Sequence, residues 1–211
     1  MRITASMKEE MMHHALRARG YADIFDWVQP DRERARCVKE QCIVDNFIHA
    51  RYRDVSPYVR IESCKPPLPD CEAIDRAGKK IGFEVTELVD ERMIEWHKNP
   101  SNPRRQKDWF ADGLFAAVVK ILLTKNRKLR VARATIREAG FERIIVIVHC
   151  DEPDLIERPA FCQKVFASRQ FPQFSEIDEA YLLLPCPRKK HLHDDEAEFC
   201  QLVPIPIGAG R

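Results

Sequence analysis

The order of apolar and polar positions along the chain predicts a series of helices and strands. Some segments repeat apolar residues at the spacing of a buried helix face, whereas others alternate or are continuously β-branched, as strands are. Helices are expected at residues 31–51, 105–128, 131–139 and 158–166. Strands are expected at residues 58–61, 70–75, 80–88, 143–149, 180–184 and 199–203. This order indicates an α/β fold with a mixed β-sheet flanked by helices.

Two further patterns define the domain and its core. Residues 7–28 have a helical pattern that is interrupted at Gly20 and ended by Pro30, so residues 1–30 are expected to form a helical N-terminal extension. Residues 31–211 are then one α/β domain, and this length suffices for a packed core. The β-branched run from Ile144 to Val148 predicts a central strand covered on both faces. The longest expected helix should bury Phe110, Leu114, Phe115, Val118, Ile121 and Leu122.

A carboxylate lies inside one of the predicted strands. Strands 70–75 and 80–88 are joined by a turn containing Gly78, so they are expected to form a hairpin. Side chains alternate along a strand, which puts Ile81, Phe83 and Val85 on one face and Gly82, Glu84 and Thr86 on the other. A buried charge is costly unless it is paired or binds a cation. Asp70 begins the neighbouring strand, and a divalent ion would relieve the repulsion between the two carboxylates. Oxygen ligands favour Mg²⁺ or Mn²⁺.

These residues resemble a known motif. Pro69-Asp70, followed fourteen residues later by Glu84-Val85-Thr86, is similar to the PD-(D/E)xK signature of restriction-endonuclease-like nucleases. The hairpin between the acids and the order of elements over roughly residues 31–150 are also similar. The resemblance implies a restriction-endonuclease-like core in which Asp70 and Glu84 bind the metal and the Val85 carbonyl completes its coordination. It also implies that Glu40, on the first helix of the domain, supports the catalytic site.

The sequence departs from the signature at one position, where Thr86 replaces the lysine. Variants with E-x-T at this place resemble a subgroup of the superfamily, and the Thr86 hydroxyl would orient the attacking water. The lysine can also be supplied by another element. Lys80, Lys107 and Lys125 are the candidates, and the sequence does not choose among them.

The distribution of charge favours a nucleic-acid partner, although the whole chain carries only +2. Between Lys98 and Arg137 there are eleven basic and two acidic residues, a local net charge of +9. Such a stripe is suited to phosphate backbones, and a solvated helix face is the alternative interpretation. The nucleic-acid contacts are expected from Arg104, Arg105, Lys107, Lys125 and Lys128.

The sequence also argues against several classes of protein. It contains no apolar stretch of membrane-spanning length, and Met1–Ala15 lacks the apolar region of a secretory signal. Eight scattered cysteines without a CxxC pair are typical of reduced thiols, so the protein is expected in the cytoplasm and away from membranes. P-loop, GxGxxG, GxSxG and HExxH motifs do not occur.

The sequence therefore predicts an Mg²⁺- or Mn²⁺-dependent endonuclease that hydrolyses phosphodiester bonds in DNA, with a homodimer left open. Two alternatives remain. Thr86 in place of lysine would also suit a decayed nuclease fold that binds nucleic acid or a protein partner. A small-molecule or unrelated metal-dependent hydrolase is the other alternative, and a deep apolar pocket would point to it.

Overall fold

The computed structural model describes residues 32–53, 55–89, 109–150, 152–185 and 200–208. The helices are α3 (Arg32–Tyr52), α5 (Ala111–Val131), α6 (Arg133–Glu138), α7 (Pro153–Ile156) and α8 (Pro159–Ala167). The strands are β1 (Tyr58–Ser63), β2 (Cys71–Asp75), β3 (Lys80–Glu87), β4 (Phe141–His149), β5 (Glu179–Leu184) and β6 (Gln201–Ile205). The predicted N-terminal extension, residues 1–30, lies outside the described residues.

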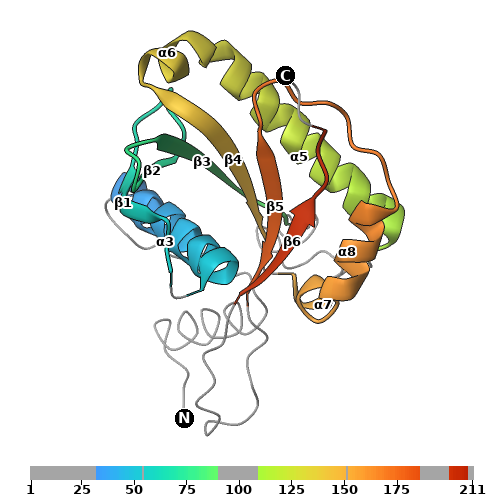
Figure 1. The fold of residues 1–211 in the computed structure, drawn as a ribbon. Coiled ribbons are helices and arrows are strands. Elements are labelled where there is room, and N and C mark those ends of the chain that lie inside the picture. Colours follow the sequence, from blue (N-terminus) through green and yellow to red (C-terminus); the bar gives the residue numbers. More distant parts are fainter. Residues whose placement is uncertain (1–31, 54, 90–108, 151, 186–199, 209–211) are drawn as a thin grey trace, which may run out of the picture.

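The strands form one six-stranded mixed sheet in the order β1-β2-β3-β4-β5-β6 (Figure 1). The pairs β1–β2, β2–β3 and β5–β6 are antiparallel, whereas β3–β4 and β4–β5 are parallel. The parallel pairs require crossovers, which α5 with α6 and α7 with α8 provide. The predicted α/β class, with a mixed sheet flanked by helices, is confirmed.

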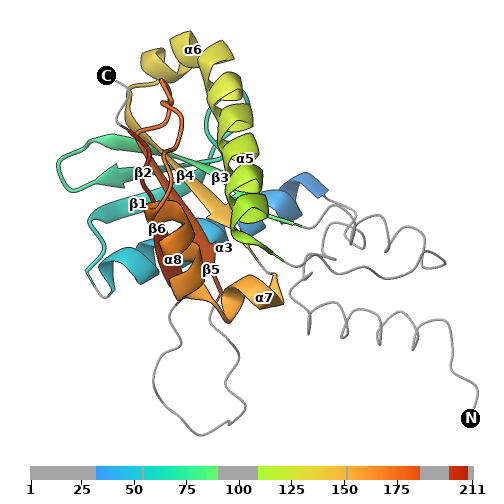
Figure 2. The ribbon, with the colours of Figure 1, turned by 90° about the vertical axis from the view of Figure 1, so that its right-hand side faces the viewer.

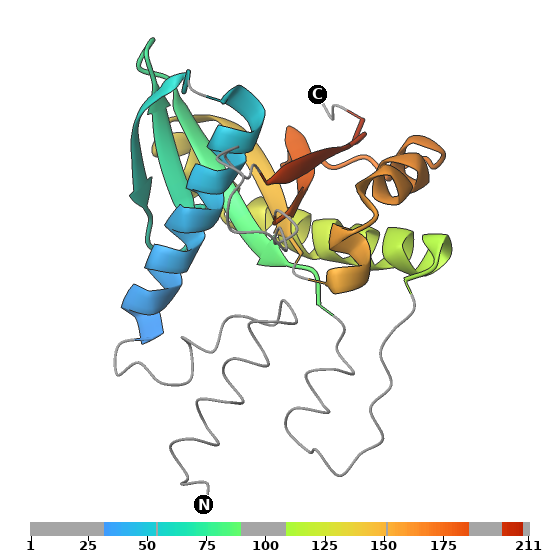
Figure 3. The ribbon, with the colours of Figure 1, turned by 90° about the horizontal axis from the view of Figure 1, so that it is seen from below.

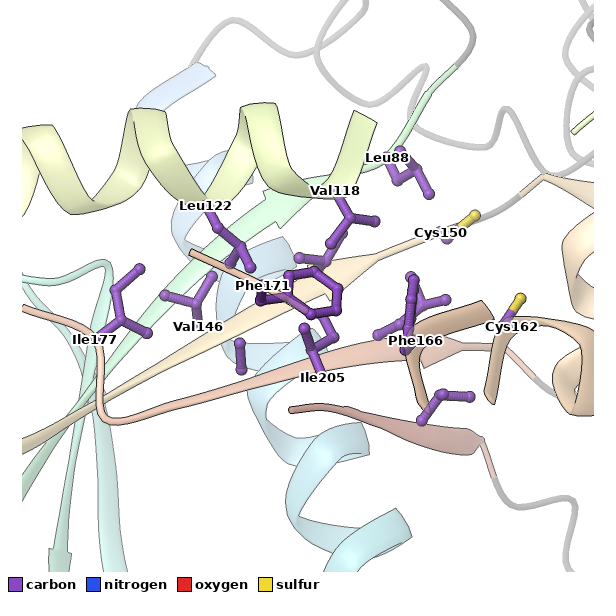
Figure 4. Packing of buried hydrophobic residues seen from close by; sticks show 14 of the residues in the cluster. Leu88, Val118, Leu122, Val146, Cys150, Cys162, Phe166, Phe171, Ile177 and Ile205 are labelled. Carbon is purple, nitrogen blue, oxygen red and sulfur yellow. The ribbon is translucent and has the colours of Figure 1, made fainter. Parts of the chain in front are cut away.

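Both faces of the sheet are covered by helices. Ile145 and Ile147 of β4 pack in a cluster with α3, whereas Val146 and Val148 belong to a second cluster with α5 and α8. Because neighbouring residues of a strand point to opposite faces, α3 lies on one face and α5 and α8 lie on the other (Figures 2 and 3). Figure 4 shows Leu122 of α5 beside Val146 in the second cluster. The prediction of a central strand buried on both faces is confirmed.

The expected helix 105–128 differs from the observed one at both ends. Residues 105–108 lie outside the described part of the chain, and α5 begins only at Ala111 because Phe110 has an extended backbone. Phe110 is 71% exposed, so the prediction that it belongs to the buried face is wrong, whereas Leu114, Val118 and Leu122 are buried as expected. The helix continues to Val131.

Smaller differences concern the other elements, and β4 begins two residues earlier than predicted. The short helix α7 was not predicted, β1 extends two residues further, and β6 begins two residues later and includes an exposed proline, Pro204, on an edge strand. The seven cysteines among the described residues are all free thiols. Within the same residues, no helix is both long and apolar enough to cross a membrane.

Candidate metal centre

Asp70 is held against the middle of β3 by local packing and hydrogen bonds. Pro69 is buried over Gly82, where a Cβ atom would lie only 2.7 Å from the Pro69 Cγ atom, so only glycine leaves room for this approach. The Asp70 carbonyl accepts a hydrogen bond from the Cys64 N–H (3.0 Å), and its carboxylate Oδ2 accepts one from the Val85 N–H (2.9 Å). The predicted proximity of Asp70 to the Glu84-Val85 segment is confirmed.

Glu84 is a fully buried carboxylate near the centre of the sheet. Its side chain is 0% exposed, and its register partner on β4 is Val146. Burial of an unpaired charge would be very unfavourable. The Glu84 carboxylate is paired with two lysine side chains of α5. The Lys125 ammonium lies 2.7 Å from Glu84 Oε2, and the Lys128 ammonium lies 3.0 Å from Oε1 and 3.1 Å from Oε2. The two lysines are three residues apart, so they lie on the same face of the helix.

Three oxygen atoms meet at the Lys125 ammonium. It donates hydrogen bonds to Glu84 Oε2 (2.7 Å), to the Val85 carbonyl (2.7 Å) and to Asp70 Oδ2 (3.3 Å). These are the side chains and the carbonyl that the sequence predicts as metal ligands. The structure therefore brings the predicted ligand set together around a single cationic group.

Lys125 is the one of the three candidate lysines that the structure places at this site. The Lys80 ammonium instead pairs with Glu72 at 3.1 Å, and Lys107 lies outside the described residues. Lys128 was expected only as a phosphate contact, but it also approaches Asp70 Oδ1 at 3.7 Å. Burial lowers the pKa of Lys128, but the charges of Glu84 and Asp70 outweigh this effect and raise it above its ordinary value.

The other predicted residues lie at different positions relative to this centre. Thr86 is half-buried and follows Glu84 by two residues in β3, so the two share a face of the strand. Its predicted role in orienting water stays a prediction. Arg104, Arg105 and Lys107 lie outside the described residues.

Glu40 of α3 has an electrostatic connection to the same site. Its side chain is 12% exposed and lies 3.4 Å from Arg36. Its pKa is raised from 4.5 to about 7, mainly by burial and then by the charge of Asp70, whereas Arg36 and Lys125 act in the opposite direction. A carboxyl group that titrates near neutral pH is typical of functional sites.

Glu40 should make the stability of the fold depend on pH. The pKa of the Glu40 carboxyl is about 7 in the folded protein and 4.5 in the unfolded chain, so the unfolded chain loses the carboxyl proton at lower pH. The free energy of unfolding therefore falls as pH rises from 4.5 to about 7. Glu40→Gln removes this cost, so in chelator at pH 8 the variant should be more stable than wild type by about 3 kcal/mol, the free energy that corresponds to the rise of its pKa. The difference should vanish near pH 4. Urea unfolding across this pH range measures it, and parallel curves for the two proteins would contradict the assignment.

The donor set fits a hard divalent cation. Two carboxylates and one main-chain carbonyl supply oxygen atoms, which Mg²⁺ and Mn²⁺ prefer. The described residues contain no cluster of three or more acidic, histidine or cysteine side chains suited to a metal. A metal at this centre would therefore depend on the Val85 carbonyl as well as on Asp70 and Glu84.

Comparison of this chain with protein-family models, with curated proteins and with solved structures finds no match. The resemblance to the PD-(D/E)xK motif thus rests on the residues of this site and on the order of elements around it.

Proposed function

We propose that this protein is an Mg²⁺- or Mn²⁺-dependent nuclease with a restriction-endonuclease-like core, which hydrolyses phosphodiester bonds in DNA. One observation carries the proposal: the Asp70 and Glu84 carboxylates and the Val85 carbonyl converge on one cationic group at 2.7–3.3 Å. Three oxygen atoms directed at one point form a site for a cation whether the occupant is an ammonium or a metal ion.

The surrounding topology supports the same proposal. Helix α3, the three antiparallel strands β1 to β3, helix α5 and the parallel strand β4 follow one another in the order that the motif resemblance implies. Asp70 immediately precedes β2, which begins one residue later than the predicted strand 70–75, and Glu84 lies in the interior of β3, so the hairpin lies between the two acids.

Each residue of the site has a proposed role. Asp70, Glu84 and the Val85 carbonyl would hold the ion, which when bound would acidify a water molecule and polarise the scissile phosphate. Lys125, supplied from α5, would take the role of the motif lysine that Thr86 replaces in β3. Its ammonium already lies within hydrogen-bonding distance of Glu84 Oε2, the Val85 carbonyl and Asp70 Oδ2.

The outer surface of α5 would bind the DNA backbone. Lys128 is 43% exposed at its side chain, compared with 16% for Lys125, so it reaches further toward solvent. Arg127 and Arg130 are exposed on the same helix. Side chains of this kind contact phosphates without reading the base sequence. Arg104, Arg105 and Lys107 remain proposed contacts outside the described residues.

A decayed nuclease fold that only binds its partner is the second candidate. It is favoured by the two lysines, whose positive charges already balance the charges of Asp70 and Glu84. A site neutralised in this way does not need a metal ion to compensate its carboxylates.

Cleavage of plasmid and single-stranded DNA by Asp70→Asn tests the proposed activity. Asparagine keeps an oxygen that can accept the Val85 N–H hydrogen bond, so the variant should fold. Wild type should cleave with Mg²⁺ or Mn²⁺ and not with chelator, and the variant should lose about 100-fold or more of this activity. Asp45→Asn, an exposed position of α3, is the matched control. Equal cleavage by wild type and Asp70→Asn would refute the assignment, and DNA binding without cleavage would favour the decayed module.

A further inference from the structure

The Lys125 ammonium occupies the point at which the three ligand oxygens converge. Its distances to Glu84 Oε2 and to the Val85 carbonyl are both 2.7 Å, and its distance to Asp70 Oδ2 is 3.3 Å. An Mg²⁺ ion bound to the same oxygens would require distances of about 2.0–2.1 Å. The two cations would then compete for the same oxygen lone pairs and would repel each other at short range.

We propose that Lys125 is a built-in competitor of the divalent metal, and that metal binding requires its ammonium to leave the three oxygens. This inference rests on the proposed metal site and concerns how that site is regulated. Displacement would free the ammonium to contact a substrate phosphate, which links metal loading to the positioning of the lysine. The site would therefore bind metal more weakly than its three oxygen ligands alone would allow.

Lys128 provides an internal comparison, since it contributes the same charge in a different position. Its ammonium contacts both Glu84 oxygens at 3.0 and 3.1 Å and lies 3.7 Å from Asp70. Lys125 differs from it by also donating to the Val85 carbonyl, at 2.7 Å. Removing either lysine takes away one positive charge beside the carboxylates, but only the removal of Lys125 vacates the point at which the three oxygens converge. Glu84 Oε2 then keeps its contact with Lys128, and Asp70 Oδ2 keeps the hydrogen bond from the Val85 N–H.

Metal titration of the full chain tests the competition directly. Binding of Mn²⁺ is followed by loss of the paramagnetic resonance signal of the free ion, for wild type, Lys125→Met, Lys128→Met and Lys125→Arg. Lys125→Met should bind Mn²⁺ about tenfold or more tightly than wild type, with a smaller gain for Lys128→Met. Lys125→Arg keeps a cation and should show no gain. An equal gain for both methionine variants, or none for Lys125→Met, would overturn the proposal.

A measurement on the wild-type protein does not depend on how the variants fold. Acetylation of lysine side chains is measured by mass spectrometry with and without Mg²⁺ at constant ionic strength. Mg²⁺ should increase the labelling of Lys125 relative to Lys164, an exposed lysine of α8. Unchanged labelling at saturating metal would overturn the proposal. If wild type and Lys125→Met both fail to bind Mn²⁺, the proposed function fails as well, whereas metal-dependent cleavage without competition would remove this inference alone.

Discussion

Glu84→Gln is expected to reduce metal-dependent DNA cleavage by at least about 100-fold while leaving the chain folded. The Glu84 carboxylate is fully buried, and its contacts with both lysines are the shorter ones, at 2.7 and 3.0 Å. Glutamine has nearly the same shape and keeps one oxygen for the Lys125 hydrogen bond, but it carries no charge to hold a divalent ion. Because losses of tenfold to 100-fold are common for groups that only support a metal ligand, loss of a direct ligand should cost at least as much.

The control for this variant is Glu138→Gln, an exposed glutamate of α6. Cleavage rates are measured under single-turnover conditions over a range of Mn²⁺ concentrations, and circular dichroism checks the fold. Activity of Glu84→Gln within a few-fold of wild type at every metal concentration would show that Glu84 has only a structural role.

Lys125→Met is expected to lower the free energy of unfolding by about 3 kcal/mol in chelator, since loss of one partner leaves a buried charge uncompensated. Glu84 is 0% exposed, and Lys125 is 16% exposed at its side chain. Lys128 remains as a second partner of Glu84, so the loss of stability should lie at the lower end of the range for broken buried ion pairs. Lys128→Met should cost less, because its side chain is 43% exposed and water can replace part of the interaction.

Urea unfolding followed by fluorescence measures both changes. Addition of Mn²⁺ should restore much of the stability lost in Lys125→Met, because an ion that binds only the folded chain shifts the equilibrium toward it. Equal destabilisation by the two substitutions, or no recovery of stability with Mn²⁺, would show that the Lys125 ammonium does not occupy the site at which the metal binds.

The geometry of the hairpin could be predicted from local patterns. Alternation along β3 correctly separated Ile81 and Phe83, which pack toward α3, from Glu84, which faces α5. The turn at Gly78 fixed the pairing of β2 with β3, and this pairing brings Asp70 beside Val85. Strand alternation and hairpin pairing depend only on residues that are close in the sequence, so both could be predicted without knowledge of the tertiary packing.

The partners of the carboxylates could not be chosen in the same way. Lys80, Lys107 and Lys125 were equivalent candidates in the sequence, because the position of a helix over a sheet is determined by tertiary packing. The structure shows that Leu122 and Leu129 of α5 are buried. This packing directs Lys125 toward Glu84. A spacing of three residues places Lys125 and Lys128 on one face of a helix, but it does not determine which carboxylates that face contacts.

The start of α5 illustrates a similar limit at a single residue. The helical spacing of apolar positions extended back to Phe110, but that side chain is 71% exposed and its backbone is extended. Trp109, the preceding residue, is buried instead. The burial of a large aromatic side chain outside the helix outweighs the periodic pattern, and periodicity alone does not reveal such an end.

The location of bound Mn²⁺ is the most direct test of the proposed metal centre. Crystals grown with Mn²⁺ would be measured at a wavelength at which manganese scatters anomalously, and the anomalous map would locate the ion. We expect a peak bound by Asp70, Glu84 and the Val85 carbonyl, with the Lys125 ammonium displaced from its contacts with these three oxygens. A map without a peak at this centre, in which Lys125 still contacts all three oxygens at saturating Mn²⁺, would contradict the proposed metal site.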